Sequence, residues 1–205
     1  MERQLRIIVP FKFNGAKGRL SSALTPDQRK ELSFAMLRDV LSTVREFGRV
    51  TILSRPGLKA EDVGRDVDIL ESDLDLNDAL NDLIEMQAEL GWPSDILIVM
   101  ADLALITRDT VKGILDCQGD VVFCPGRGGG TNMILIRNCI FRTCYQGRRP
   151  SFLENLEFSR RSGLSAAVYE SFRAGCDIDV PEDLVEVLLH GRGEARRLLE
   201  GWGLR

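Results

Sequence analysis

The stretch Ile7-Ile8-Val9-Pro10-Phe11-Lys12-Phe13-Asn14-Gly15-Ala16-Lys17-Gly18-Arg19-Leu20 decides the fold class of this chain. It begins as a short apolar run typical of a buried strand, and at a proline it passes into a loop with two glycines and three cations. Ligands of open α/β sheets bind at the carboxyl ends of strands. The loop is therefore predicted to hold an oligophosphate through backbone N–H groups and Lys12, Lys17 and Arg19. A solvated cationic turn is the alternative. The loop matches neither the Walker pattern nor G-x-G-x-x-G.

Runs that predict strands alternate with helical segments through the first two thirds of the chain. Strands are expected at 5–10, 49–54, 67–70, 95–100, 120–125 and 133–137, and later at 166–172 and 176–180. Helices are expected at 26–47, 76–90, 107–117, 150–161, from 181 onward and at 195–199. Thr25, Pro26 and Gln28 form a capping-box start for the first of them. The pattern predicts one α/β domain over residues 1–205, with three α/β/α layers around a mostly parallel, mixed sheet.

Composition narrows the classes of function. The chain has 205 residues, a hydrophobic fraction of 44% and a formal net charge of −4, so no nucleic-acid-binding surface is expected. No apolar run is long enough to span a membrane and no secretory leader is recognisable, so a cytoplasmic protein without membrane contact is expected. The only histidine is His190, in a late apolar segment, which disfavours catalysis built on histidine. Chemistry is therefore expected from carboxylates, cations and a metal.

Three aspartates at predicted strand ends are candidate metal ligands. Asp102 directly follows the apolar run 95–100, and its alternative role is to cap the following turn. Asp177 and Asp179 alternate along a segment expected to be extended, so both are predicted to point to one side, where a cation must separate them. Mg²⁺ held by one or two carboxylates and substrate phosphates fits this set. The alternative for Asp179 is to cap the helix at Pro181.

A glycine-rich stretch supplies the fourth feature of the predicted site. Gly128, Gly129 and Gly130 allow close approach of a ligand to the backbone, and the hydroxyl of Thr131 and the amide of Asn132 suit a phosphate or carboxylate. A flexible hairpin tip is the alternative. A cationic phosphate loop with dispersed aspartates and no histidine favours nucleotidyl transfer. An attacking phosphate oxygen is already ionised, so no general base is needed.

The same residues resemble the 2-phospho-L-lactate guanylyltransferases of coenzyme F-420 biosynthesis. The resemblance runs along nearly the whole chain, and its motifs occur in the family's order. They are Val9-Pro10-x-Lys12, Ala16-Lys17-x-Arg19-Leu20-Ser21, Leu76-Asn77-x-Ala79-Leu80, Ala101-Asp102-Leu103-x-Leu105, Gly129-Gly130-Thr131-Asn132, Pro150-Ser151-Phe152 and Asp177-Ile178-Asp179-x-Pro181-Glu182-Asp183-Leu184.

The resemblance implies a nucleotide-diphospho-sugar transferase fold of the glycosyltransferase-A-like kind, often dimeric. The implied reaction moves GMP from GTP to the phosphate of (2S)-2-phospholactate, giving lactyl-diphospho-guanosine and pyrophosphate. The implied roles cover the nucleotide, the acceptor and the metal. The nucleotide would be bound by Pro10, Lys12, Gly15, Lys17, Arg19, Asn77 and Asp102, of which the catalytic residues would be Lys12, Lys17, Arg19 and Asp102. The acceptor would be bound by Thr131, Asn132, Gly147 and Ser151. Mg²⁺ would be held by Asp102, Asp177 and Asp179.

Several alternatives stay open. The same chemistry can act on phosphoenolpyruvate or another phospho-acid. A sugar phosphate or the molybdenum cofactor can be the acceptor on the same fold. A module that binds GTP without releasing pyrophosphate is the alternative from a different class. For the expected homodimer, apolar side chains near Phe141 and Trp202 are candidate surface for the interface.

Overall fold

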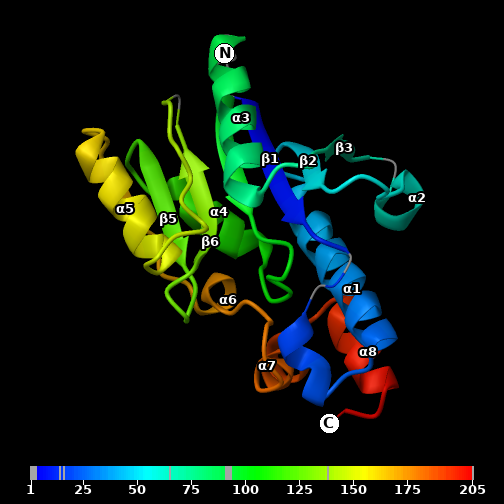
Figure 1. Ribbon diagram of the computed structural model, residues 1–205. Helices are drawn as coiled ribbons and strands as arrows, with labels where there is room; N and C mark the ends of the chain where they lie inside the picture. The colour runs from blue at the N-terminus through cyan, green and yellow to red at the C-terminus, as the bar shows by residue number, and fades with distance from the viewer. Residues whose placement is uncertain are drawn as a thin grey trace.

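A computed structural model describes residues 4–13, 15, 17–64, 66–90, 94–137 and 139–204. The described strands form one seven-stranded sheet in the order β3-β2-β1-β4-β6-β5-β7 (Figure 1). Their bounds are β1 Gln4–Phe11, β2 Arg49–Ser54, β3 Asp68–Glu71, β4 Ser94–Val99, β5 Val121–Pro125, β6 Thr131–Ile136 and β7 Ala166–Val168. All adjacent pairs are parallel except the two that involve β6. The predicted mostly parallel, mixed sheet is confirmed.

Helices cover both faces of this sheet. Strand residues alternate between two clusters: Ile7 and Val9 face one, and Ile8 faces the other. The first cluster includes residues of α1 and α4, and the second includes residues of α3 and packs against α5. The described helices are η1 Gly18–Ser22, α1 Pro26–Val44, α2 Ala60–Val63, α3 Leu76–Glu89, α4 Arg108–Asp116, α5 Ser151–Arg161, α6 Phe172–Gly175, α7 Asp183–His190 and α8 Glu194–Gly201. The three-layer α/β/α architecture follows.

Most element predictions are confirmed, and two are wrong. The Thr25/Gln28 capping box opens α1, and Thr107 caps α4. The strand expected over 166–172 ends at Val168, and α6 occupies its last position. Residues 176–180 form no strand, because the backbone hydrogen bond that links this segment to the neighbouring backbone runs from Ile178 N to Asp102 O, in the loop after β4. The expected helix stop at 91–93 lies outside the described residues.

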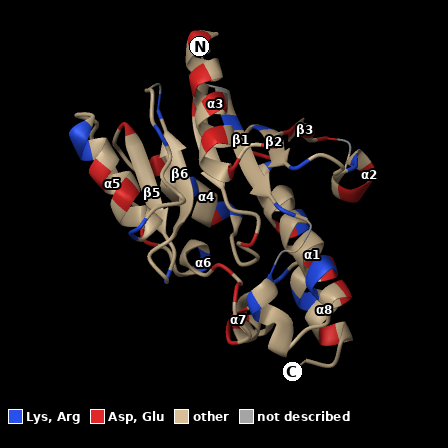
Figure 2. Cartoon of the chain, viewed as in Figure 1, with Lys and Arg blue, Asp and Glu red and all other residues tan. Residues whose placement is uncertain are grey.

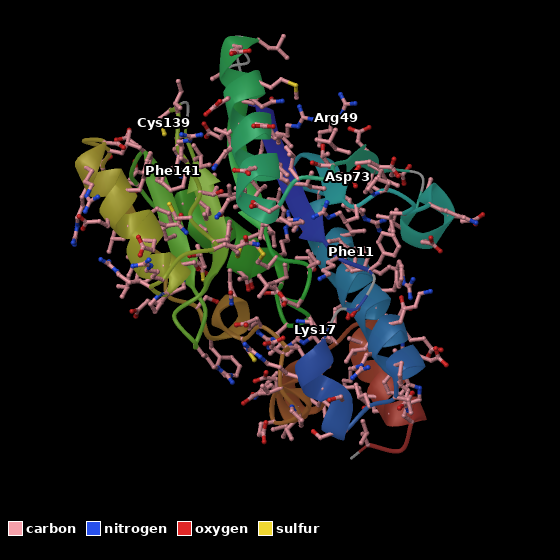
Figure 3. The ribbon with its side chains drawn as sticks, in the orientation of Figure 1. Phe11, Lys17, Arg49, Asp73, Cys139 and Phe141 are labelled. Atoms are coloured by element: carbon pink, nitrogen blue, oxygen red, sulfur yellow. The ribbon has the colours of Figure 1, made fainter. Side chains whose placement is uncertain are left out.

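Phe141, near which apolar surface for an interface is expected, itself belongs to the core. It is 1% exposed and packs between Phe123 of β5 and Phe158 of α5 (Figure 3). Aromatic side chains carry a large apolar area, which favours such burial wherever a helix covers a sheet. Apolar surface near Phe141 comes from its neighbour Ile140, which is exposed.

The C-terminal helices pack on the outer side of α1. In Figure 1, α8, drawn in red, lies along α1. A third cluster joins Leu32 and Met36 of α1 to Leu184 of α7 and Leu199 of α8. Asp39 of α1 accepts hydrogen bonds from the first backbone N–H groups of α8, those of Glu194 and Ala195. The start of α8 is thus held by a side chain distant in sequence.

Replacing Asp39 by alanine is expected to lower the free energy of unfolding by about 1–2 kcal/mol, because two N–H groups at the start of α8 lose their acceptor. Chemical denaturation measures the change. Asp82→Ala is the matched control, since Asp82 is an exposed aspartate on α3. Equal loss in both variants would contradict the capping role of Asp39.

Candidate active site

A cavity of about 530 Å³ lies at the carboxyl ends of β1, β2, β3 and β4. The chain leaves β1 toward β2 and β3 and then returns past β1 to β4, so the strand order reverses between β1 and β4. Such a reversal opens a crevice at the carboxyl ends of the strands, which is where ligands of open α/β sheets bind. Its lining residues are Pro10, Phe11, Lys12, Gly15, Lys17, Ser33, Met36, Leu53, Ser54, Arg55, Ser72, Leu74, Asp75, Leu76, Ala79, Met100, Ala101, Asp102, Gln146 and Asp179.

The basic loop after β1 directs one lysine into this cavity. Lys17 adopts a left-handed backbone conformation, with φ 59°, just before η1. Its side chain is only 10% exposed, and its Nζ lies 2.6 Å from Oδ2 of Asp102 and 3.7 Å from Oδ1 of Asp179. A backbone conformation that costs a non-glycine residue energy is kept here together with a partly buried ion pair. The solvated-turn alternative does not describe Lys17, which is labelled in Figure 3.

The other predicted loop residues lie around the same space. Pro10, Lys12 and Gly15 line the cavity, and Gly15 has a φ of 64°. Arg19 is exposed, with its Nη1 2.6 Å from Oδ2 of Asp179. In Figure 2 the blue loop after β1 lies beside the red segment that leads to α7. The loop thus brings several positive charges to one mouth of the cavity.

Asp102 stands at the end of β4 with one oxygen in use. Its Oδ2 accepts from Lys17, and its Oδ1 is buried without a hydrogen-bond partner among the described residues. The alternative role of capping the next helix belongs to Thr107 instead. A buried carboxylate oxygen without a donor is costly unless a ligand completes it. The chemistry of this oxygen fits a cation from the substrate complex.

The structure separates Asp177 from Asp179. Asp179 contacts Lys17 and Arg19, whereas Oδ1 of Asp177 accepts a hydrogen bond from Asn132 Nδ2 at 3.1 Å. Among the described residues no side chain caps the start of α7, and Oδ2 of Asp183 accepts from the backbone N–H groups of residues 179 and 180, which precede the helix. Asp179 is therefore not a helix cap, and the prediction that both carboxylates point to one side is wrong.

The carboxylates that face the cavity fit a divalent cation. Asp102 and Asp179 share one ammonium group, and no group of three or more acidic, histidine or cysteine side chains suited to a metal occurs within the described ranges. Mg²⁺ commonly takes one or two protein carboxylates and completes its shell with waters and substrate phosphates. The donor set therefore suits a metal that arrives with a nucleotide.

Asn77 lies beside the cavity but its amide is engaged with the protein backbone. Its Oδ1 accepts from the N–H of Tyr145 at 2.6 Å, and its Nδ2 donates to the carbonyl of Gln146 at 3.4 Å. Its neighbours Leu76 and Ala79 line the cavity wall. Contact between Asn77 and a nucleotide stays a prediction.

The predicted acceptor residues gather at the start of β6 and of α5. Thr131 and Ser151 are buried, with their hydroxyl oxygens 3.1 Å apart. Asn132 is buried as well, donating to the carbonyl of Ala174 and to Asp177. Gly147 is exposed on the loop before α5, apart from the Thr131–Ser151 pair. Their contact with an acceptor stays a prediction.

The hairpin-tip alternative for the glycine-rich stretch is confirmed in part. Residues 126–130 connect β5 to β6, with the N–H of Gly126 bonded to the carbonyl of Gly130. The tip is anchored, because the carbonyl of Gly129 accepts from Phe152 of α5 and the N–H of Arg127 donates to Gly175. Gly129 has a φ of 78°, which favours glycine there.

The buried cysteines give no support for nucleophilic thiol chemistry. Burial raises the pKa of Cys124 to about 12. Burial is also the largest of the influences that raise the pKa of Cys176 to about 11. Both thiols therefore stay protonated near neutral pH. Burial likewise raises the pKa of Tyr145, whose hydroxyl is buried without a described partner.

Sequence reasoning missed the wall of the cavity beyond β1. Ser54 ends β2 and Arg55 follows it, Ser72 follows β3, and Asp75 caps α3. Arg55 is bonded to the carbonyl of Asp73, which fixes the loop between β3 and α3. These residues form no sequence motif, so the only available signal was their position directly after predicted strands.

The fold and its crevice define a class of protein. A solved structure described as a putative nucleotide-diphospho-sugar transferase from Desulfovibrio desulfuricans G20 superposes with a TM-score of 0.82 at 19% identity, covering 98% of this chain and 96% of that one. A nucleotidyl transferase from Methanothermobacter gives a TM-score of 0.65 at 14% identity, covering 97% and 99%. The chain has the nucleotide-diphospho-sugar transferase fold.

Sequence similarity then shows the family. Residues 5–202 match the family described as "Guanylyl transferase CofC like". A protein of Methanothrix thermoacetophila named 2-phospho-L-lactate guanylyltransferase is 53% identical over 207 residues, covering 100% of this chain and 92% of the relative. The similarly named protein of Methanosarcina barkeri is 41% identical, covering 95% and 91%. The chain belongs to this family of guanylyl transferases and is an enzyme.

Proposed function

We propose that this enzyme transfers GMP from GTP to the phosphate of (2S)-2-phospholactate, in the biosynthesis of coenzyme F-420. The products are lactyl-diphospho-guanosine and pyrophosphate. The observation that carries the proposal is the cluster of Lys17, Asp102 and Asp179 at the mouth of a crevice at the reversal of strand order. The family match and the name of the 53% identical relative support the substrate pair.

The reaction is an in-line displacement at the α-phosphorus of GTP. An oxygen of the acceptor phosphate forms the new bond, and the bond from the α-phosphorus to the bridging oxygen breaks, releasing pyrophosphate. The attacking oxygen is ionised at neutral pH, so the protein needs no general base. Its task is to align two polyanions and to neutralise their charge, which Lys12, Lys17 and Arg19 perform.

Mg²⁺ belongs to the proposal as the partner of the triphosphate. It would be held by Asp179 and by Asp102, whose Oδ1 has no partner among the described residues. When bound it would screen the phosphate charges and orient the triphosphate. Asp177 acts indirectly here, holding the Asn132 amide at the start of β6.

The test is release of pyrophosphate from GTP and Mg²⁺ with 2-phospholactate, with phosphoenolpyruvate and with no acceptor. Release that requires 2-phospholactate, and is fastest with it, is the expected result. Faster release with phosphoenolpyruvate would identify phosphoenolpyruvate as the acceptor. Release only with a sugar phosphate or the molybdenum cofactor, tested as further acceptors, would assign the enzyme to another kind of nucleotidyltransferase. GTP binding without any release would indicate a binding module.

Replacing Thr131 by valine is expected to raise the KM for the acceptor about fivefold, because one hydrogen-bonding hydroxyl is lost from a buried site. The KM for GTP is expected to stay within twofold of the wild-type value. Initial rates with each substrate varied in turn measure both constants. Thr51→Val is the control, since Thr51 is a buried threonine of β2. Equal changes in both constants would place Thr131 on the nucleotide side.

A homodimer in the cytoplasm completes the proposal. Ile140 and Leu189 are large apolar side chains that are 63% and 65% exposed, and such side chains are available to cover each other between copies. Light scattering is expected to give a molar mass near twice 22.9 kDa. A mass of one chain at micromolar concentration would contradict the dimer. Among the described helices, none is long and apolar enough to cross a membrane.

A further inference from the structure

Three asparagine side chains hold the segment between β6 and α5 by its backbone. Asn81 of α3 accepts from the N–H of Thr143 at 2.7 Å, and Asn77, one turn earlier, accepts from the N–H of Tyr145 at 2.6 Å. Asn155 of α5 accepts from the N–H of Cys144 between them, at 2.8 Å. Successive N–H groups thus bond to helices on opposite sides of the segment.

Asn155 differs from the other two because its amide also reaches the predicted acceptor residues. It is fully buried, and its Nδ2 donates to Oγ1 of Thr131 at 3.0 Å. The N–H of Cys144 requires an acceptor, so Oδ1 must lie on that side and Nδ2 on the side of Thr131. The orientation of this amide is therefore fixed by its surroundings.

The fixed amide is the first member of a chain of hydrogen bonds that continues through two hydroxyl groups. Oγ1 of Thr131 accepts a hydrogen bond from Asn155 and lies 3.1 Å from Oγ of Ser151, so that its own hydrogen can point to Ser151. The proton of Ser151 is then left for a further acceptor. Hydrogen bonds aligned in one direction polarise one another, which strengthens the last donor toward an anion.

We propose that Asn155 is the positioning residue of the acceptor site. Its amide directs the Thr131 hydroxyl toward Ser151, so that Ser151 donates to an anionic oxygen of the phospho-acid. At the same time it fixes Cys144, two residues before Gln146 at the cavity wall. This inference deepens the proposed function and rests on it, since the phospho-acid is the proposed acceptor.

The test compares Asn155→Ala with Ser159→Ala. Ser159 is equally buried one turn further along α5, and within the described part of the chain its hydroxyl bonds only to the carbonyl of Asn155. Asn155→Ala is expected to weaken 2-phospholactate binding, measured by calorimetry, about tenfold, the effect of one lost hydrogen bond to a charged group. GTP binding is expected to change less than twofold. Ser159→Ala is expected to leave both within twofold.

Two further variants separate positioning from folding. Asn155→Asp keeps an oxygen that accepts the hydrogen bond from the N–H of Cys144, but when ionised it has no hydrogen to donate to Thr131. The variant is therefore expected to bind 2-phospholactate more weakly although its side chain has the same shape. In a Ser151→Ala background, Asn155→Ala is expected to weaken 2-phospholactate binding less than twofold further, because both substitutions act through the Ser151 hydroxyl. Thermal melting identifies a variant that fails to fold.

The outcomes are distinguishable. Equal loss of GTP and phospho-acid binding in Asn155→Ala would overturn the inference, and so would additive losses with Ser151→Ala. Wild-type protein that binds 2-phospholactate but releases no pyrophosphate would contradict the proposed function alone, and the binding comparison would still decide the role of Asn155. Wild-type protein that binds neither 2-phospholactate nor phosphoenolpyruvate would overturn the inference as well.

Discussion

Replacing Asp102 by asparagine is expected to lower kcat about 100- to 1000-fold, the range seen when one transition-state-stabilising group is removed. The amide fills the same space but carries no charge. Oδ1 of Asp102, which has no described protein partner, would no longer attract a cation that accompanies the triphosphate. Pyrophosphate release measures kcat, and calorimetry with GTP shows whether the nucleotide still binds.

The control for this substitution is Asp109→Asn, because Asp109 is an exposed aspartate in the first turn of α4. It is expected to keep the wild-type rate. GTP binding by Asp102→Asn is expected to survive, since the loop after β1 still presents its cations. A wild-type kcat in Asp102→Asn would remove Asp102 from the catalytic residues.

Replacing Lys17 by methionine is expected to lower kcat/KM for GTP about 100-fold or more, through loss of a charge-assisted contact to phosphate. The same change leaves Asp102 and Asp179 without the ammonium that lies between them. Mutual repulsion of these carboxylates favours any other cation at that position. Mn²⁺, used as a probe without nucleotide, is therefore expected to bind the variant more tightly than the wild type.

Lys30→Met provides the control, since Lys30 is an exposed lysine of α1. Electron paramagnetic resonance of free Mn²⁺ measures binding without any turnover. Unchanged kcat/KM for GTP in Lys17→Met would assign Lys17 a structural role. Weaker Mn²⁺ binding in that variant would mean that the two carboxylates depend on Lys17 for their placement.

The sequence was informative where local chemistry decides the outcome. Apolar runs located the central strands, and Thr25 with Gln28 located the start of α1. Placing Lys17 and Asp102 at one crevice followed from the rule on strand ends, and the structure brings them within an ion pair. Their catalytic roles stay predictions that the substitutions above test.

Tertiary contacts decided what the sequence could not predict. Asp177 and Asp179 were expected to act together because of their spacing. Asp177 instead accepts a hydrogen bond from Asn132, whereas Asp179 forms an ion pair with Lys17 in the loop after β1. Lys17 adopts a conformation that no local pattern indicates for a lysine. In the sequence nothing distinguishes Asn155 from other polar residues of a helix. Its burial depends on contact with the segment that follows β6, where it accepts from the N–H of Cys144.

Because β6 runs antiparallel to its neighbours, it brings its first residues to the sheet edge where the crevice lies. Parallel strands bring their last residues to this edge, whereas β6 brings its first, and the N–H of Met100 at the end of β4 bonds to the carbonyl of Asn132. In the proposed reaction, the nucleotide would be held by loops that leave the sheet, and the acceptor by the start of β6, which enters it. If these assignments hold, changes in the hairpin and α5 would alter the choice of small acid and leave the loop after β1 and its cations unchanged.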